Sequence, residues 1–142
     1  MNRIRPLAIC VFLKNGRILV AEGYDPVKNE CFYRPLGGGI EFGEYSEQTI
    51  RRELLEEIGA EVCDLKYLRT LENIYVFNGT PGHEIIQIYD GALKDPELYE
   101  RTEIIGREVD IDASFRAVWK HIAEFGTGKS ILYPTGLLEL LK

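Results

Sequence analysis

The apolar positions of this chain fall mostly into short runs of strand length, separated by polar or glycine-rich segments. Continuous apolar runs of about four to eight residues are typical of buried strands, and alternating runs of strands with one face in solvent. On this pattern strands are predicted at residues 7–13, 18–21, 31–35, 61–69, 71–77, 83–93 and 115–119. Asn15-Gly16 separates the first two runs and predicts a tight hairpin between them. The polar segments 22–30, 78–82 and 94–112 are expected to be loops.

Residues 46–58 follow the period of an α-helix instead. The apolar residues that share one arc of this helix are Ile50, Leu54 and Ile58. Ser46 suits the N-cap position, and Gly59 suits the residue that ends a helix in a left-handed conformation. A helical turn is expected at 122–125 and a short helix at 134–141. Strands before and after one central helix, with a second helix at the end, predict an α/β fold whose sheet is covered on both sides.

Three glutamates occupy the arc beside the apolar stripe of the central helix: Glu53, Glu56 and Glu57. Two glutamates four positions apart repel each other by about 0.2–0.5 kcal/mol, and moving them toward the core costs more. A bound divalent cation would remove both costs, because hard cations prefer carboxylate oxygens. A solvated, charge-rich helix face is the alternative interpretation of the glutamates alone.

The helix belongs to a longer pattern, which makes the metal interpretation the stronger one. Its fixed residues are Gly38, Glu44, Arg52, Glu53, Glu56, Glu57 and Gly59. At an average usage of about one in fifteen for each residue type, chance agreement is roughly one in 10⁸ per starting position. The chain resembles a Nudix hydrolase, with a Nudix box from Gly38 to Ala60. Ala60 is smaller than the side chain usual at the last position, which we interpret as a packing variation.

This resemblance implies a fold and an activity. The fold is an α/β/α sandwich around a mixed β-sheet, formed by a single Nudix hydrolase domain over residues 1–142. The activity is metal-dependent hydrolysis of a pyrophosphate bond in a nucleoside diphosphate linked to another moiety. ADP-ribose-like compounds, nucleoside triphosphates and dinucleoside polyphosphates all stay open as substrates. An RNA 5′-end pyrophosphohydrolase and a non-catalytic nucleotide-binding module with the same fold are the alternatives.

The resemblance also assigns roles within the box. The implied ligands of Mg²⁺ or Mn²⁺ are Glu53, Glu56, Glu57 and a backbone carbonyl near Gly37. Glu53 serves as the base for the attacking water or orients that base. Arg52 and Glu44 form an ion pair that holds the helix and aims Glu53.

A carboxylate from outside the box is expected to complete the site, since several metals generally need more ligands than one helix presents. Asp112 and Glu84 are favoured, because each adjoins the end of a predicted strand and rigid elements position ligands well. Glu108 and Asp110 compete with them, and a solvated acidic loop over 97–112 is the alternative. No substrate-binding residue is assigned. The aromatic residues that could stack on a base, or belong to the core or the rim, are Tyr24, Phe32, Tyr33, Tyr75, Phe77 and Tyr89.

Composition limits the partners and the compartment. The net charge is −6 and lysine and arginine form no run, which argues against nucleic acid as a partner. The three cysteines are scattered without metal or disulfide spacing, as in a reducing compartment. The first apolar run is too short for a signal peptide, and no stretch reaches the length of a membrane span. We therefore expect a cytoplasmic protein with a nucleotide-type small-molecule substrate; a homodimer stays open.

Overall fold

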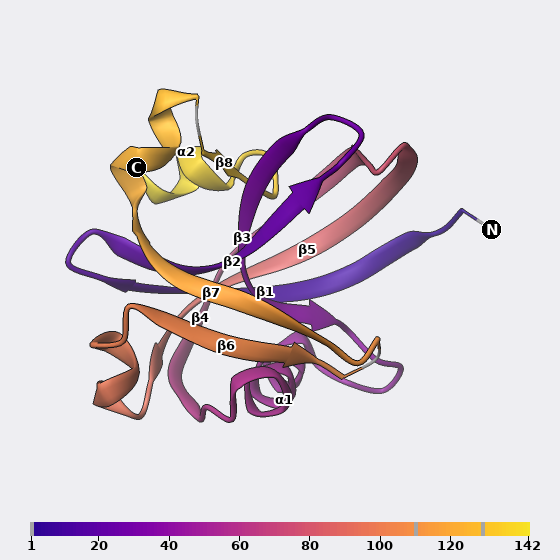
Figure 1. The fold of residues 1–142 in the computed structure, drawn as a ribbon. Coiled ribbons are helices and arrows are strands. Elements are labelled where there is room, and N and C mark those ends of the chain that lie inside the picture. Colours follow the sequence, from indigo (N-terminus) through magenta and orange to yellow (C-terminus); the bar gives the residue numbers. More distant parts are fainter. Residues whose placement is uncertain (1, 110, 129) are drawn as a thin grey trace.

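The computed structural model describes residues 2–109, 111–128 and 130–142, and over these ranges it contains one sheet of eight strands with helices on both faces (Figure 1). The strands are β1 (Ile4–Lys14), β2 (Arg17–Asp25), β3 (Glu30–Gly39), β4 (Val62–Phe77), β5 (Thr80–Leu93), β6 (Glu103–Glu108), β7 (Ala113–His121) and β8 (Ile131–Leu132). The helices are α1 (Ser46–Ile58) and α2 (Leu137–Leu141), with 3-10 helices η1 (Pro96–Tyr99) and η2 (Ile122–Thr127).

The sheet is mixed, as predicted. Its strand order is β4-β5-β1-β3-β2-β7-β6, and β8 pairs with β3. The β1–β5 and β3–β8 pairs are parallel, and the remaining pairs are antiparallel. The predicted hairpin at Asn15-Gly16 joins β1 to β2, where Leu13 faces Ile18. The expected α/β architecture is therefore confirmed.

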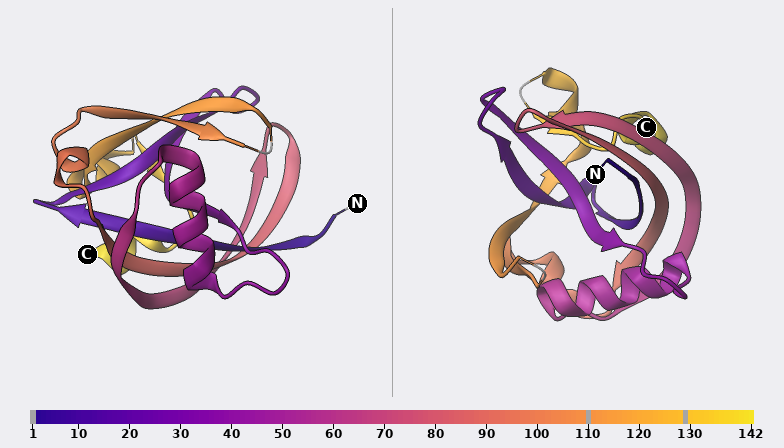
Figure 2. Two further views of the ribbon diagram at one scale, coloured as in Figure 1. Left: turned by 90° about the horizontal axis from the view of Figure 1, so that it is seen from below. Right: turned by 90° about the vertical axis from the view of Figure 1, so that its right-hand side faces the viewer.

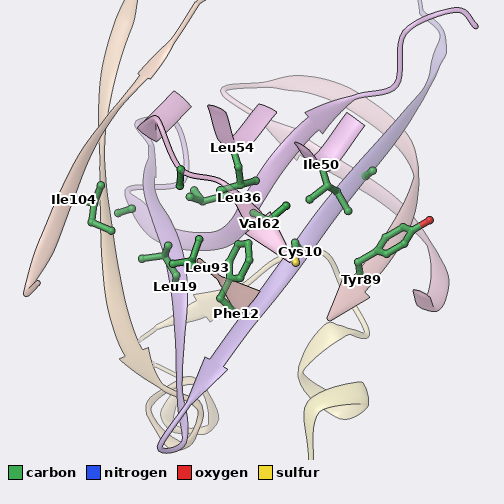
Figure 3. Packing of buried hydrophobic residues seen from close by; sticks show 13 residues of the cluster. Cys10, Phe12, Leu19, Leu36, Ile50, Leu54, Val62, Tyr89, Leu93 and Ile104 are labelled. Carbon is green, nitrogen blue, oxygen red and sulfur yellow. The ribbon is translucent and has the colours of Figure 1, made fainter. Parts of the chain in front are cut away.

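Strand β1 separates two hydrophobic cores, because successive side chains of a strand point to opposite faces. Ala8, Cys10 and Phe12 pack with α1 on one face (Figure 3). The alternate residues of β1 join a second core, which also contains Phe125 of η2 and Leu137 of α2. Helices α1 and α2 thus cover opposite sides of the sheet (Figure 2), and the central residues of β1 are buried on both faces.

Helix α1 begins one residue earlier than the predicted N-cap, Ser46, would place its start. Tyr45 is the N-cap, and Ser46 is the first helical residue, with its hydroxyl 2.6 Å from the hydroxyl of Tyr89. The helix ends as expected at Gly59, whose φ of 66° is left-handed. Ile50 and Leu54 are fully buried against the sheet. This packing orients the adjacent glutamate arc toward one end of the sheet.

The region predicted as an irregular loop over 94–112 contains a strand, and that prediction is wrong in this part. Strand β6 pairs with β7 along its whole length. Its sequence gave little sign of a strand, because Ile104 is its one buried apolar side chain and Gly106 occupies the next inward position. The loop predicted at 22–30 is also shorter, since residues 22–25 of β2 pair with residues 30–33 of β3. The two strands predicted at 61–69 and 71–77 form the single strand β4, with irregular pairing to β5 near its start.

Candidate active site

Arg52 connects α1 to the loop that precedes it. Its guanidinium donates from Nε and Nη2 to the two carboxylate oxygens of Glu44, at 2.8 and 2.9 Å. It also donates to Oε1 of Glu53 at 2.9 Å and to the backbone carbonyl of Gly39 at 3.0 Å. Hydrogen bonds from Arg52 lower the pKa of Glu44 to about 2. The guanidinium thus brings together the end of β3, Glu44 and Glu53, in the arrangement expected from the box.

Two glycines of β3 make room for this arrangement. A Cβ on Gly38 would lie 2.5 Å from the carboxyl carbon of Glu53, so this carboxyl group rests directly on the glycine backbone. Gly37 has a φ of 151°, and a Cβ there would lie 2.1 Å from the carbonyl oxygen of Ala8. Only glycine fits both constraints. Glu53 is held against the strand by Gly38 below it and by Arg52 beside it.

Glu57 is a buried acid with an unsatisfied oxygen. Glu57 is 6% exposed, and its Oε1 has no hydrogen-bond partner among the described residues. Burial, with the nearby charges of Glu108 and Glu53, raises the pKa of Glu57 to about 9. A buried polar group without a partner is destabilising, and a cation would supply the missing partner. The structure therefore contains a residue suited to hold a divalent cation.

Glu108 brings a carboxylate from outside the box to this point. It is the last residue of β6, and its carboxylate lies close enough to Glu57 to raise the pKa of that residue. Glu53, Glu56, Glu57 and Glu108 all line one cavity of about 270 Å³, together with Gly37 and Gly38. From the sequence Glu108 is only a competing candidate, because the residues of β6 show little of the pattern of a strand.

Asp112, one of the two carboxylates favoured by the sequence, lies away from this cavity. Asp112 is exposed at the β6–β7 turn, where it pairs with Arg107, and it does not line the cavity. Asp110 lies outside the described residues. The position of Asp112 gives no support for a role as a metal ligand.

Glu84 lines the cavity but is already paired. It is fully buried and faces Arg5 on β1 and Asn73 on β4 in the sheet register. Arg5 and Arg34 form ion pairs with its carboxylate at 3.5 and 3.4 Å. The hydroxyl of Tyr75 donates to Oε2 at 3.2 Å, and the Asn73 amide donates to Oε1 at 3.5 Å. The geometry makes Glu84 an anchor for two arginines.

A second cavity of about 520 Å³ continues from the first. The two cavities form one cleft with the arginines at the junction, since both are lined by Arg5, Ala21, Arg34, Glu84, Glu108 and Phe115. The aromatic residues that line the second cavity are Phe32, Tyr75, Phe77, Phe115 and Tyr133. Phe32, Tyr75 and Phe77 were among the predicted stacking candidates. Phe115 and Tyr133 were missed, since each reaches the cleft only through long-range pairing of its strand or loop.

The donor set fits a hard divalent cation, although the carboxylates are not preassembled around one. Across residues 2–109, 111–128 and 130–142 no three acidic, histidine or cysteine side chains have the arrangement of a preformed metal site. Glu56 is half-exposed and contacts Arg52 at 3.4 Å. Rotation of glutamate side chains is therefore required for a cation to bind. The unsatisfied oxygen of Glu57 is the observation that favours such binding.

The α/β/α fold and a carboxylate-bearing helix beside a glycine-rich strand define a class of protein, and comparison with known families agrees. A NUDIX domain matches residues 2–126, and the chain belongs to this family. Within the described part of the chain, no helix is long and apolar enough to cross a membrane.

Curated relatives match in a shorter region. An RNA pyrophosphohydrolase of Blochmanniella floridana is 42% identical over 53 residues, which are 37% of this chain and 31% of that protein. The NAD-capped RNA hydrolase NudC of Vibrio vulnificus is 37% identical over 65 residues, 46% of this chain and 24% of that protein. The matches thus span a third or less of the length of these relatives.

Solved structures share the fold over most of the chain. A NUDIX hydrolase from Nitrosomonas europaea has a TM-score of 0.62 at 19% identity, covering 98% of this chain and 86% of that one. A MutT NUDIX hydrolase from Burkholderia pseudomallei has a TM-score of 0.59 at 20% identity and covers 86% of each chain. At these identities the likeness concerns the fold alone.

Proposed function

We propose that this protein hydrolyses a pyrophosphate bond in a nucleoside diphosphate linked to another moiety, with the help of Mg²⁺ or Mn²⁺. The observation that carries the proposal is the buried, unsatisfied carboxylate oxygen of Glu57 beside Glu108. Such a group is costly in a protein that never binds a cation. Family membership and the adjoining aromatic cavity support a nucleotide as the substrate.

The residues proposed to hold the cation are Glu53, Glu56, Glu57, Glu108 and the backbone carbonyl of Gly37, all of which line the smaller cavity. A bound divalent cation would neutralise phosphate oxygens and lower the pKa of a water ligand. Glu108 takes the place first considered for Asp112 and Glu84. Its position at the end of a paired strand holds it next to Glu57.

Arg52 and Glu44 position the acid that we propose as the base. One oxygen of Glu53 accepts a hydrogen bond from Arg52, and the side chain lines the cavity. Burial raises the pKa of Glu53, while the bond from Arg52 opposes this shift. Glu53 is thereby held in one orientation, from which it accepts the proton of the attacking water.

Arg5 and Arg34 are proposed to bind the phosphates of the substrate. Both lie at the junction of the two cavities, and Glu84 anchors both. Arginine suits this task because its planar guanidinium matches phosphate oxygens. The substrate would then lie with its diphosphate at the carboxylates and the remainder in the aromatic cavity.

A substrate panel with product identification tests the proposal. ADP-ribose, nucleoside triphosphates and dinucleoside polyphosphates are each incubated with Mg²⁺, with Mn²⁺ and with excess chelator. We expect cleavage of at least one of them into two phosphate-bearing products, complete loss of turnover in chelator and recovery when the cation returns. Full turnover in excess chelator would exclude the metal-dependent mechanism. Tight nucleotide binding without any turnover would instead favour the non-catalytic module.

Removal of pyrophosphate or a cap from an RNA 5′ end is a second candidate, favoured by the names of the matched relatives. The net charge of −6 weighs against it, since RNA binding depends on neutralising phosphates. Oligonucleotides with a 5′-triphosphate or an NAD cap belong in the same panel. A kcat/KM for these that exceeds the value for every mononucleotide would make RNA the preferred substrate.

A further inference from the structure

Three glycines around the cleft each face an aromatic residue directly across a pair of strands. The pairs are Gly23 with Phe32, Gly82 with Tyr75, and Gly106 with Phe115. In each pair the ring covers the glycine, since an added Cβ would lie 2.4, 2.3 and 2.2 Å from a ring carbon, respectively. All three rings line the larger cavity, although they come from three different strand pairs. The glycine–aromatic pairing is therefore a feature of the cleft and does not arise from one local stretch of sequence.

This pairing leaves the larger cavity open. Side chains of a strand ordinarily stand away from the sheet, and a large ring in that position would project into the cleft. Here the end of each ring leans over the neighbouring strand, in space that only a glycine leaves free. The resulting cavity of about 520 Å³ lies within the usual size range of small-molecule sites.

The Gly82–Tyr75 pair also affects the arginines. By leaning over Gly82, the Tyr75 ring brings its hydroxyl to 3.2 Å from Glu84. Glu84 in turn holds Arg5 and Arg34 at the junction of the two cavities. The shape of the aromatic cavity and the position of the phosphate-binding groups are thus linked through one ring.

We propose that Gly23 and Gly82 determine substrate specificity, by letting Phe32 and Tyr75 lie against the sheet and so keeping the cavity open for a planar heteroaromatic base. Both glycines line this cavity, as do both rings. An aromatic ring that leans on the sheet offers an apolar surface to a planar ligand, and stacking on such rings tolerates any base. The inference rests on the proposed function, because it concerns the part of the same substrate that lies beyond the diphosphate.

The substitutions Gly23→Ala and Gly82→Ala test this inference. In both, the added methyl group meets the far end of a side chain rather than the backbone, so the ring is displaced into the cavity and the sheet can still form. Gly126→Ala is the matched control, since no atom lies within 4 Å of its Cβ position and Gly126 lines neither cavity. Circular dichroism and thermal unfolding of all three variants verify that each is folded.

Steady-state kinetics compare a nucleotide that the protein cleaves with ribose 5-diphosphate, which has no base. We expect KM for the nucleotide to rise at least about tenfold in both cavity variants, with kcat within about threefold of the parent. The KM for ribose 5-diphosphate should stay unchanged in Gly23→Ala. In Gly82→Ala it should rise by less than the KM for the nucleotide, because displacement of Tyr75 also removes its hydrogen bond to Glu84, and Gly126→Ala should behave like the parent. A parallel rise in KM for both compounds in Gly23→Ala, or no rise for the nucleotide in either cavity variant, would overturn the inference.

Binding without turnover separates this inference from the proposed activity. Equilibrium dialysis with a nucleotide whose diphosphate bridge is a methylene group, in the presence of Mg²⁺, measures affinity alone. Weaker binding in the two cavity variants supports the inference even if the parent hydrolyses nothing; equal binding contradicts it even if the parent is an active hydrolase. Phe32→Leu and Tyr75→Leu remove the stacking surface and should weaken binding as well, so the test holds if an alanine variant fails to fold.

Discussion

Two buried glutamates line the same cleft in opposite surroundings. Glu84 is fully buried and is held by two arginines, Tyr75 and Asn73. Glu57 is 6% exposed, has an oxygen without a partner in the described structure, and lies beside the acids Glu53 and Glu108. The two side chains are buried to nearly the same extent, so burial alone does not decide the role of each glutamate.

The two glutamates differ in whether the chain itself supplies positive charges beside them. Around Glu84 the cations are supplied by the chain, and the group forms part of a fixed scaffold. Around Glu57 the chain supplies further negative charge, which a bound cation from solution would balance. A buried acid with its partners in place is evidence for structure, whereas a buried acid among other acids is evidence for a ligand. Four substitutions test this contrast.

Glu57→Gln should have the largest effect, because it keeps the shape of the side chain and removes a negative ligand. We expect turnover at saturating Mg²⁺ to fall by about two orders of magnitude or more. Glu61→Gln is the matched control, since Glu61 is an exposed glutamate that pairs with Lys94. Normal activity in a destabilised Glu57→Gln protein would make this residue structural.

The stability of Glu57→Gln without metal should equal or exceed that of the parent. A folded-state pKa of about 9, above the usual 4.5, makes ionisation of Glu57 unfavourable in the fold. Its cost is absent below pH 4.5 and grows between pH 4.5 and 9, so the advantage of glutamine grows over the same window. Added Mg²⁺ should raise the melting temperature of the parent more than that of the variant.

Glu108→Gln should reduce turnover by about tenfold or more, since we propose that Glu108 is the carboxylate from outside the box. Asp112→Asn is the comparison, because Asp112 is one of the two carboxylates favoured by the sequence and lies exposed beside Arg107. We expect Asp112→Asn to keep the parental rate. The assignment fails if the asparagine variant loses activity while the glutamine variant keeps it.

Glu84→Gln should act on stability, in the opposite direction to Glu57→Gln. Glutamine cannot balance Arg5 and Arg34, and two charge-assisted contacts are lost. Both arginines are partly exposed, which limits the cost to about 1–3 kcal/mol in the free energy of unfolding. Urea unfolding of parent and variant at pH 7 without metal measures this difference in the free energy of unfolding. A stability equal to that of the parent would remove the contrast between the two buried acids.

Glu44→Gln should have the smallest effect, and one that depends on pH. The bonds from Arg52 lower the pKa of Glu44 to about 2, so its stabilisation is fully present above pH 4.5 and is lost as the pH falls toward 2. After solvent screening we expect a difference on the order of 1 kcal/mol at pH 7. Urea unfolding of parent and variant between pH 7 and 2.5 should show the two curves converging. A difference that is constant across this range would contradict the ion pair as its cause.

The box and its helix were predictable because their signals are local. Helix period, the ending glycine and the spacing of Arg52 and Glu53 all lie within one short stretch, where side-chain directions follow from the helix itself. The one local error, Ser46 for Tyr45 as the N-cap, shifted the helix start by a single residue. Long apolar strands such as β1 were predictable for the same reason.

Short or polar strands were not predictable, since pairing with neighbours holds them in place and not their own composition. Strand β6 has one buried apolar side chain and depends on β7 for its hydrogen bonds. The preference for Asp112 over Glu108 has the same origin, because a residue placed by strand pairing cannot be located when the strand is missed. Glu84 was recognised as a candidate, but its partners lie on three other strands.

By itself, the sequence determined the family, the α/β class and the helix that carries Glu53, Glu56 and Glu57. Only the tertiary structure decided that Glu108 lies beside these glutamates, that Glu84 is already paired with arginines, and where the aromatic cavity lies. The physical reason is that sheet register places residues distant in the chain side by side: Glu84 faces Arg5 and Asn73, and Glu108 reaches Glu57 from β6. Those neighbours decide whether a buried carboxylate pairs with arginines or is suited to bind a cation.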